Sequence, residues 1–336
     1  MSIRIGIPRA LLFYHYLPLW ETFFQALGAE VILSPPTSQE ILNRGVRLGM
    51  ADLCLPMKVH LGHVEVLRDG CDFLFLPRLV SFSPDSYMCP KFLGLPDFTR
   101  AAVEALPPIL EPLINAKVKG KGLQEGFVEM GRSLGSREDR IQEAIGEAKR
   151  AQARFEDLLH CGIPPAQAMG LVGCRSPRAV AGGKRGGTDL PPLAVVGHPY
   201  NLYDSYLNFG LLDRVREWGY EPLTPERVDE GETGAGMAAP RKAIYWSLAR
   251  HIVASALHFL ASGNLAGMIF VSSVACGPDS FCQDLLQRRL RRSYPVPYLS
   301  LTLDEHSSYA GVQTRLEAFL DMVRAREGRE GPLGDR

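Results

Sequence analysis

Three cysteines far apart in the chain are each followed within two residues by a proline, in the runs Cys54-Leu55-Pro56, Cys89-Pro90 and Cys276-Gly277-Pro278. Proline is favoured in the first turn of a helix, where its missing N–H would have had no partner. Each cysteine should therefore lie just outside a helix N-terminus. The free N–H groups and the positive dipole end there are expected to lower the pKa of each thiol and to favour an anionic iron–sulfur cluster.

Three thiolates can bind three irons of a cubane cluster and leave the fourth iron open to water, substrate or an external ligand. The pattern therefore predicts Cys54, Cys89 and Cys276 as metal ligands, with a [4Fe–4S] cluster as the expected cofactor. Structural zinc is a competing interpretation, but zinc sites usually contain close Cys-x2-Cys pairs, which this sequence lacks. Cysteines that only pack in the core are a third interpretation.

The other four cysteines have weaker claims. Cys282 lies one or two turns into the helix predicted after Cys276, so it is a reserve ligand, although packing explains it as well. Cys71 opens a predicted buried strand and is expected in the core. Cys161 and Cys174 flank a segment rich in Gly and Pro, and no role is assigned to them. Seven cysteines, an odd number, disfavour a disulfide framework.

Four polar residues near the predicted ligands are further candidates. His198 follows a predicted strand and is a candidate general acid or donor to cluster sulfide, because histidine titrates near neutrality. A hydrogen bond that stabilises the turn is its alternative role. Lys58, His63 and Lys91 could shape the electric field around a cluster. Ordinary polar contacts explain these three equally well.

Two groups of neighbouring residues are candidate binding sites, one for a small ligand and one for a metal. Tyr200, Tyr203 and Tyr206, with Asp204, could line a pocket for a planar or acyl ligand, and core packing explains them at least as well. The run Asp304-Glu305-His306 has the composition of a metal site. Three adjacent residues in a loop do not point to one centre, so we interpret the run as a helix entry and a contact between domains.

The chain alternates short apolar runs with helical patterns, which is typical of a parallel α/β sheet. In the first half, strands are expected at 4–7, 29–33 and 72–76, and helices at 19–27, 38–48 and 136–160. In the second half, strands are expected at 193–197, 267–272 and 298–301, and helices at 206–218, 241–260, 279–292 and 312–324. Cys89 and Cys276 would then lie beyond the carboxyl ends of strands, where open α/β sheets bind ligands.

These elements predict two Rossmann-like α/β domains with parallel sheets and a cluster site between them. The first domain is expected at 1–165 and includes a long helical extension. A Gly- and Pro-rich linker is expected at 166–192, and the second domain at 193–336. Two ligands would come from the first domain and one from the second, so a shared cluster would join them.

Composition excludes several classes of protein. The chain has 336 residues, and its 37 basic residues balance its 37 acidic ones, which argues against nucleic acid as a partner. No segment is long and apolar enough to span a bilayer. The first residues lack the pattern of a secretory signal, so a cytoplasmic location is expected.

Several ordered motifs resemble one family. They are Gly6-Ile7-Pro8-Arg9, Cys54-Leu55-Pro56-Met57-Lys58, Gly62-His63, Pro77-Arg78, Cys89-Pro90-Lys91, Gly197-His198-Pro199-Tyr200, Cys276-Gly277-Pro278-Asp279-Ser280 and Asp304-Glu305-His306. Together they resemble the acyl-CoA dehydratase activase-related proteins. That group is similar to the cluster-binding subunits of 2-hydroxyacyl-CoA dehydratases and benzoyl-CoA reductases, and to the double-cubane cluster proteins. The resemblance extends from about Ile5 to about Met322 and carries the ligand role to Cys54, Cys89 and Cys276 only.

The resemblance implies an oxygen-sensitive iron–sulfur protein that carries out or supports low-potential, one-electron reduction of a bound small substrate at an open iron. Its partner would be an ATP-dependent activator with its own cluster, because this sequence has no Gly-x4-Gly-Lys-Ser/Thr loop. An acyl-CoA is one substrate that it implies. The alternative is a non-catalytic electron-transfer or cluster-handling partner protein. Whether the chain is catalytic by itself stays open, as do a double-cubane cluster, a cluster shared by two chains and a dimer.

Overall fold

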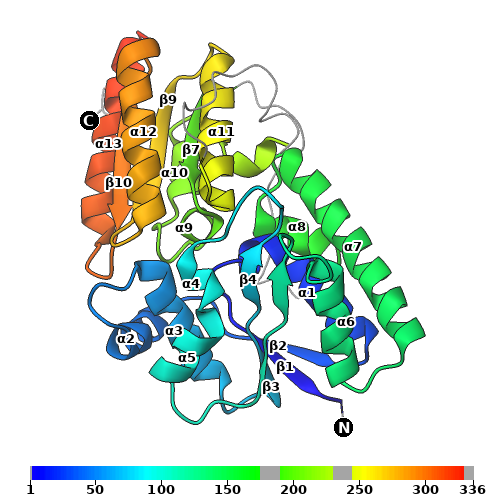
Figure 1. Ribbon diagram of the computed structural model, residues 1–336. Helices are drawn as coiled ribbons and strands as arrows, with labels where there is room; N and C mark the ends of the chain where they lie inside the picture. Colours follow the sequence, from blue (N-terminus) through cyan, green and yellow to red (C-terminus); the bar gives the residue numbers. More distant parts are fainter. Residues whose placement is uncertain (1, 175–189, 230–243, 329–336) are drawn as a thin grey trace.

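The computed structural model describes residues 2–174, 190–229 and 244–328. Figure 1 shows two lobes, with the first half of the chain below and the second half above. Each lobe is built on a parallel sheet with helices packed on it. The fold class predicted from the sequence, two Rossmann-like α/β units with parallel sheets, is confirmed.

The first lobe contains a four-stranded sheet of order β2-β1-β3-β5 and a two-stranded parallel ribbon, β4-β6. The strands are β1 Arg4–Ile7, β2 Glu30–Leu33, β3 Phe73–Phe75, β4 Arg78–Ser81, β5 Ile109–Leu110 and β6 Leu113–Asn115. The helices are α1 Phe13–Ala26, α2 Gln39–Leu48, α3 Leu55–Leu67, α4 Pro90–Leu93, α5 Leu95–Ala102, α6 Leu123–Ser133, α7 Glu138–His160 and α8 Pro165–Leu171.

The second lobe repeats the plan of the first. Its strands are β7 Pro192–Gly197, β8 Glu221–Leu223, β9 Gly267–Ser273 and β10 Tyr298–Leu303, and its sheet has the order β10-β9-β7-β8. Its helices are α9 Pro199–Leu202, α10 Leu211–Glu217, the 3-10 turn η1 Pro225–Arg227, α11 Ser247–Ala261, α12 Gly277–Ser293 and α13 Tyr309–Arg326. In both lobes the first strand lies between the second and the third. That reversal of strand order creates a crevice at the carboxyl ends of the strands.

Two glycines set the position of α3, whose first turn follows Cys54. A Cβ atom on Gly45 of α2 would lie 1.8 Å from the carbonyl oxygen of Lys58, and one on Gly62 would lie 2.0 Å from that of Ile41. No side chain fits at either position without moving backbone. The two helices therefore pack backbone to backbone, which fixes the place of the helix mouth at Cys54.

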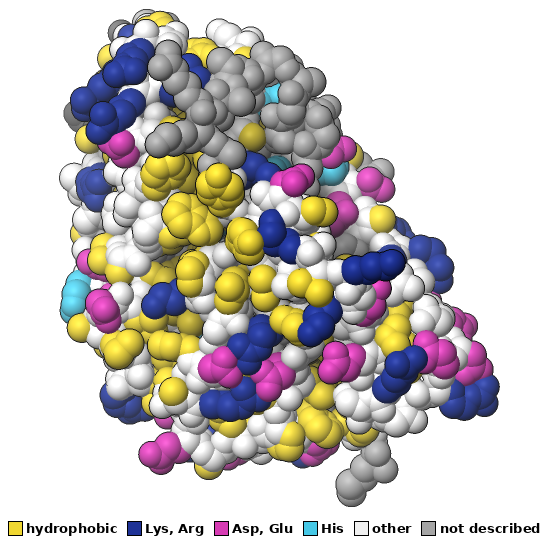
Figure 2. Space-filling model, in the orientation of Figure 1, with side chains coloured by type: hydrophobic (Ala, Val, Ile, Leu, Met, Phe, Trp, Pro, Cys, Tyr) yellow, Lys and Arg dark blue, Asp and Glu magenta, His cyan; other side chains and the backbone are white. Residues whose placement is uncertain are grey.

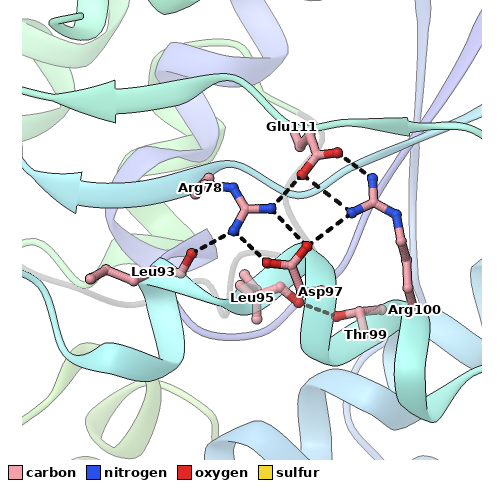
Figure 3. A network of polar contacts seen from close by, with 7 residues as sticks. All are labelled: Arg78, Leu93, Leu95, Asp97, Thr99, Arg100 and Glu111. Atoms are coloured by element: carbon pink, nitrogen blue, oxygen red, sulfur yellow. Dashed lines mark hydrogen bonds and ion pairs between the residues drawn. The ribbon is translucent and has the colours of Figure 1, made fainter.

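A charged network fixes α4, the helix that begins after Cys89 (Figure 3). The Arg78 guanidinium donates to the carbonyl oxygen of Leu93, the last residue of α4, at 3.0 Å, and to both carboxylate oxygens of Asp97 at 2.6 and 2.9 Å. It also donates to Glu111 at 2.8 Å. Because a bidentate guanidinium–carboxylate pair has a defined geometry, this network ties α4 and α5 to the ends of β4 and β5.

The predicted linker at 166–192 is only partly described. Its first residues form α8, which packs against α1 and α7. Residues 175–189, including Gly182 to Gly187, lie outside the described residues, so the domain boundaries stay a prediction. Among the helices that the structure describes, none is long and apolar enough to cross a membrane.

A buried carboxyl group joins the lobes. The Thr37 hydroxyl, from the first lobe, donates to Oδ2 of Asp204 in the second at 2.5 Å. Backbone N–H groups of Tyr206 and Leu207 donate to Oδ1 at 3.1 and 3.2 Å. These donors lower the pKa of Asp204, but burial outweighs them and raises it from 3.8 to about 6.

Asp204→Asn is expected to stabilise the protein at pH 7.5 by about 1–3 kcal/mol. A carboxyl with a raised folded-state pKa contributes stability below its unfolded pKa, near 4, and loses that contribution as the pH rises through 6. Asparagine stays neutral and keeps Oδ1 as the acceptor for the two backbone N–H groups, while its NH2 group can donate to the Thr37 hydroxyl. Urea unfolding of both proteins at pH 4 and pH 7.5 tests this prediction. An equal difference at the two pH values would contradict it.

Candidate metal centre

The three cysteines singled out by the sequence line one cavity between the lobes. Cys54 and Cys89 come from the first lobe and Cys276 from the second. The cavity has a volume of about 30 Å³, and its other walls are mainly apolar. Its remaining lining residues are Leu11, Pro56, Met57, Lys91, Phe92, His198, Tyr200, Trp246, Leu248, Ala249 and Pro278. Figure 2 shows hydrophobic side chains gathered over the part of the surface where Figure 1 places α4, α9 and α12.

Each of these cysteines is the N-cap residue of a helix, as predicted. Cys54 precedes α3, Cys89 precedes α4 and Cys276 precedes α12, with proline at the first or second helical position in all three. His198 is likewise the N-cap of α9, which starts with Pro199. Four helix N-termini therefore meet at the cavity.

The expectation that the helix mouths lower the pKa of these thiols is wrong for the protein without bound metal. Burial raises the pKa of Cys54, Cys89 and Cys276, and it is the largest effect at each. Backbone N–H groups of Met57, Lys91 and Asp279 lower the pKa of the respective thiol, but by less. The loss of hydration therefore raises each thiol pKa by more than the helix N-terminus lowers it, and a bound cation would favour the thiolates.

The three sulfurs are near enough to interact electrostatically. A charge on Cys89 raises the pKa of Cys54, and a charge on Cys54 raises that of Cys276. All three raise the pKa of the Tyr200 hydroxyl, for which burial is the larger cause. Tyr200 therefore lies among the three thiols. If the thiols were ionised, their negative charges would repel one another unless a metal neutralised them.

A buried pair of side chains adjoins Cys276. His198 Nε2 lies 3.0 Å from Oδ1 of Asp279, and the backbone N–H of Ser273 donates to Oδ2 at 3.2 Å. The imidazole stacks on Tyr200 with the ring centroids 4.9 Å apart. One ligand atom each from His198, Cys276 and Asp279 lies within 4.8 Å of the others, which gives a possible mixed-ligand metal site.

The backbone carries strain at two places beside the cavity. Ala275, directly before Cys276, has a φ of 61°, and Leu11, which lines the cavity, has a φ of 55°. Residues with a Cβ atom rarely adopt this left-handed region, and such strain tends to occur at functional sites. The turn between β9 and α12 is therefore held by its surroundings in a conformation that directs Cys276 to the cavity.

The remaining candidates fall into two groups. Lys91 and Tyr200 line the cavity. Lys58 and His63 do not: Lys58 pairs with Glu305, and His63 Nε2 lies 3.0 Å from the Thr37 hydroxyl. Lys58 and His63 therefore make ordinary polar contacts away from the cavity lining, which was the second interpretation of these two residues.

The other cysteines lie away from the cavity lining. The reserve ligand Cys282 is buried, and its thiol contacts the carbonyl oxygen of Ala249 at 3.8 Å. Cys71 is a core residue, as expected, and donates to the carbonyl oxygen of Leu67 at 3.3 Å. Cys161 is exposed and Cys174 is half-buried.

The structure also places the tyrosine group and the run Asp304-Glu305-His306. Tyr203 donates to the Thr224 hydroxyl at 2.8 Å, and Tyr206 donates to Gln39 at 2.8 Å, so neither joins Tyr200 at the cavity. The contact between domains expected of Asp304-Glu305-His306 is confirmed by the ion pair of Glu305 with Lys58.

Asp279 is the residue that sequence reasoning missed. It occurs in the motif after Cys276, but no role was assigned to it. An acidic residue at the third helical position commonly faces the N-cap residue, so the position of Asp279 in the sequence could have predicted that it lies beside Cys276. Its partner His198 is 81 residues earlier in the chain, so no local pattern could pair them.

Residues 4–228 match the family described as CoA enzyme activase uncharacterised domain. The chain belongs to that family. The match covers two of the three thiols, Cys54 and Cys89, and His198, whereas Cys276 and Asp279 lie beyond it. No curated protein matches the chain.

Membership in an activase family confirms the activase-related part of the resemblance. The likeness to the cluster-binding subunits of dehydratases gains no support from it. The predicted function, reduction of a bound substrate by a cluster-carrying component of the dehydratase type, is wrong, because the family description points to the activator instead. It gives no support to the alternative, a non-catalytic electron-transfer or cluster-handling protein.

Proposed function

We propose that this chain works on the activating side of a CoA-dependent enzyme system and holds an iron–sulfur cluster through Cys54, Cys89 and Cys276. The activating role rests on the family match. The cofactor rests on one observation, the three helix-capping cysteines that line a single cavity between the lobes.

The donor set suits an iron–sulfur cluster better than structural zinc. Zinc in structural sites takes four closely placed ligands, whereas this cavity offers three thiols from distant segments and apolar walls. Backbone N–H groups reach each sulfur, and such hydrogen bonds stabilise cluster-bound thiolates. A bound cluster would supply a one-electron redox centre.

The chain's own residues would orient and shield this centre. Asp279 Oδ1 accepts from His198 Nε2–H at 3.0 Å, which fixes the imidazole over Tyr200 and leaves its Nδ1 buried without a partner among the described residues. A proton at Nε2 thus has a defined acceptor next to Cys276. Leu11, Phe92 and Trp246 exclude water from the same space.

The partner that fits this role is a CoA-dependent dehydratase that needs activation. A separate ATPase carrying its own cluster is the second partner that we propose, and it would supply the nucleotide-driven step. Cys89 is half-buried and Lys91 is exposed at the edge of the cavity, so this side of the chain is the one that would face a partner.

The proposal predicts that anaerobically purified protein contains iron and sulfide in equal amounts and restores activity to an inactive CoA-dependent dehydratase. The measurements are iron and sulfide per monomer, and dehydratase turnover with ATP, a low-potential reductant and the ATPase, with and without this chain. A fully loaded chain that gives no activation would reject the activating role. A chain that activates the dehydratase without iron would reject the cofactor.

A further inference from the structure

A second, larger cavity lies between the lobes. Helices α1 and α7 border it from the first lobe, and η1 and α11 border it from the second, with a volume of about 560 Å³ between them. In Figure 1, α7 runs from the lower lobe to the upper one beside this region. Leu248 lines both cavities, so the second one reaches the wall of the thiol site.

A buried amide presents an unused acceptor to this cavity. The Gln152 amide nitrogen donates to the carbonyl oxygen of His15 at 2.8 Å and to Glu156 Oε1 at 2.9 Å. Both partners are oxygens that only accept, so the nitrogen must face them and the orientation of the amide is fixed. The amide oxygen Oε1 is buried and has no partner among the described residues, although only 8% of the Gln152 surface is exposed.

A histidine presents a second unused acceptor from the opposite lobe. His251 Nε2 lies 3.1 Å from the carbonyl oxygen of Pro225 and must carry the proton, because a carbonyl only accepts. In the neutral ring Nδ1 then holds a lone pair. This atom is buried without a partner in the part of the chain that the structure describes. Buried acceptors without partners are costly, so a ligand that donates to both would bind with a gain.

The charges around the cavity select the type of donor. The buried carboxyl group of Glu226 lines the cavity, whereas Glu156 and the basic residues Lys149 and Arg250 are all exposed. An anion at the inner wall would meet two lone pairs and this carboxyl group. We propose that this cavity binds a small organic diamine, whose ammonium groups donate to Gln152 Oε1 and His251 Nδ1.

Isothermal titration of the full-length, anaerobically purified protein with putrescine tests the proposal. One binding site per chain is expected, and Gln152→Leu or His251→Leu should each weaken binding at least tenfold. Gln142→Leu, an exposed glutamine on the same helix outside the cavity, is the matched control and should change nothing.

Succinate, which has the same carbon chain with anionic ends, distinguishes the alternative. Binding of succinate in place of putrescine would overturn the proposal, and so would the absence of putrescine binding. Putrescine binding that neither Gln152→Leu nor His251→Leu weakens would overturn it too. If Gln152→Leu fails to fold, His251→Leu still decides the outcome. The test reads ligand binding and does not depend on iron or on dehydratase activation.

Discussion

Anaerobically purified Cys54→Ser, Cys89→Ser and Cys276→Ser proteins are each expected to lose most of the iron that the unchanged chain contains. The affinity for the cluster should fall by more than about tenfold. Changing a residue that only hydrogen-bonds to a metal ligand already lowers metal affinity by about that much, and these cysteines would be the ligands themselves. Serine keeps the size of the side chain but is a poor ligand for iron. Iron and sulfide per monomer, with the visible absorption spectrum, are the measurements.

Two matched controls separate ligation from folding. Cys71→Ser and Cys282→Ser also change buried thiols, but those thiols contact the carbonyl oxygens of Leu67 and Ala249 and do not line the cavity. Both variants should keep their iron if they fold. Equal iron in all five variants and the unchanged chain would contradict the ligand assignment. Loss of iron in Cys282→Ser alone would identify Cys282 as the ligand instead.

Asp279→Asn addresses the neighbour of Cys276 in the same experiment. Asparagine keeps one acceptor oxygen, for the Ser273 N–H, and turns its NH2 group toward His198, and it removes a negative charge that raises the pKa of the Cys276 thiol. Iron should therefore be retained in this variant. Retention here, with loss in Cys276→Ser, would show that the Cys276 sulfur is the ligand and that the Asp279 carboxylate is not.

The local chemistry of the site followed from the sequence, because the rules that place it are local. A proline in the first helical turn requires a helix to begin there, and all three cysteines are N-caps as a result. The α/β pattern placed Cys276 after β9, at a carboxyl end where ligands bind. These inferences needed no knowledge of distant contacts.

What the sequence missed depends on such contacts. The sign of the thiol pKa shift came from how deeply the lobes bury Cys54 and Cys276, which no local pattern contains. Lys58 is one turn into the helix after Cys54, where an effect on the cluster and an ordinary polar contact were equally good interpretations, and α3 turns it toward Glu305. The predicted function failed for a different reason, since motifs shared by related components do not say which component a chain is.

Removing the carboxylate of Glu305 is expected to cost about 2–4 kcal/mol of unfolding free energy, since it leaves the Lys58 ammonium buried without its counter-charge. The Lys58 side chain is 3% exposed, and its ammonium donates to Glu305 and, at 3.1 Å, to the carbonyl oxygen of Ala51. Glu305 is 18% exposed, so water offsets part of the loss and the lower half of this range is the better guide for Glu305→Gln.

The pair also gives a pH dependence of known sign. Burial raises the pKa of Glu305, but the hydrogen bond from Lys58 and its charge outweigh burial, and the net pKa lies below its usual 4.5. A lowered folded-state pKa contributes stability above the unfolded pKa, and that contribution is lost as the pH falls through the folded one. The difference between Glu305→Gln and the unchanged protein should therefore be full at pH 7 and shrink below about pH 4.

A double-mutant cycle decides whether the pair itself carries this energy. Lys58→Met removes the ammonium and keeps an unbranched apolar chain, so Lys58→Met with Glu305→Gln should be much less destabilised than the sum of the single variants. Asp284→Ala breaks an exposed ion pair with Arg288 and should change stability by less than about 0.5 kcal/mol. Urea unfolding gives all of these values. Strict additivity would contradict a coupled pair.

The cycle has a second readout, because the pair lies on the same helix as a proposed ligand. Lys58 is in the first turn of α3, directly after Cys54, and Glu305 follows β10 in the lobe that supplies Cys276. Breaking the pair removes a contact that holds these two cysteines at one cavity. Glu305→Gln should therefore lose iron faster than the unchanged chain when a chelator is added, at a denaturant concentration where both remain folded. An unchanged rate of iron loss would show that other contacts between the lobes are enough to keep the thiols together.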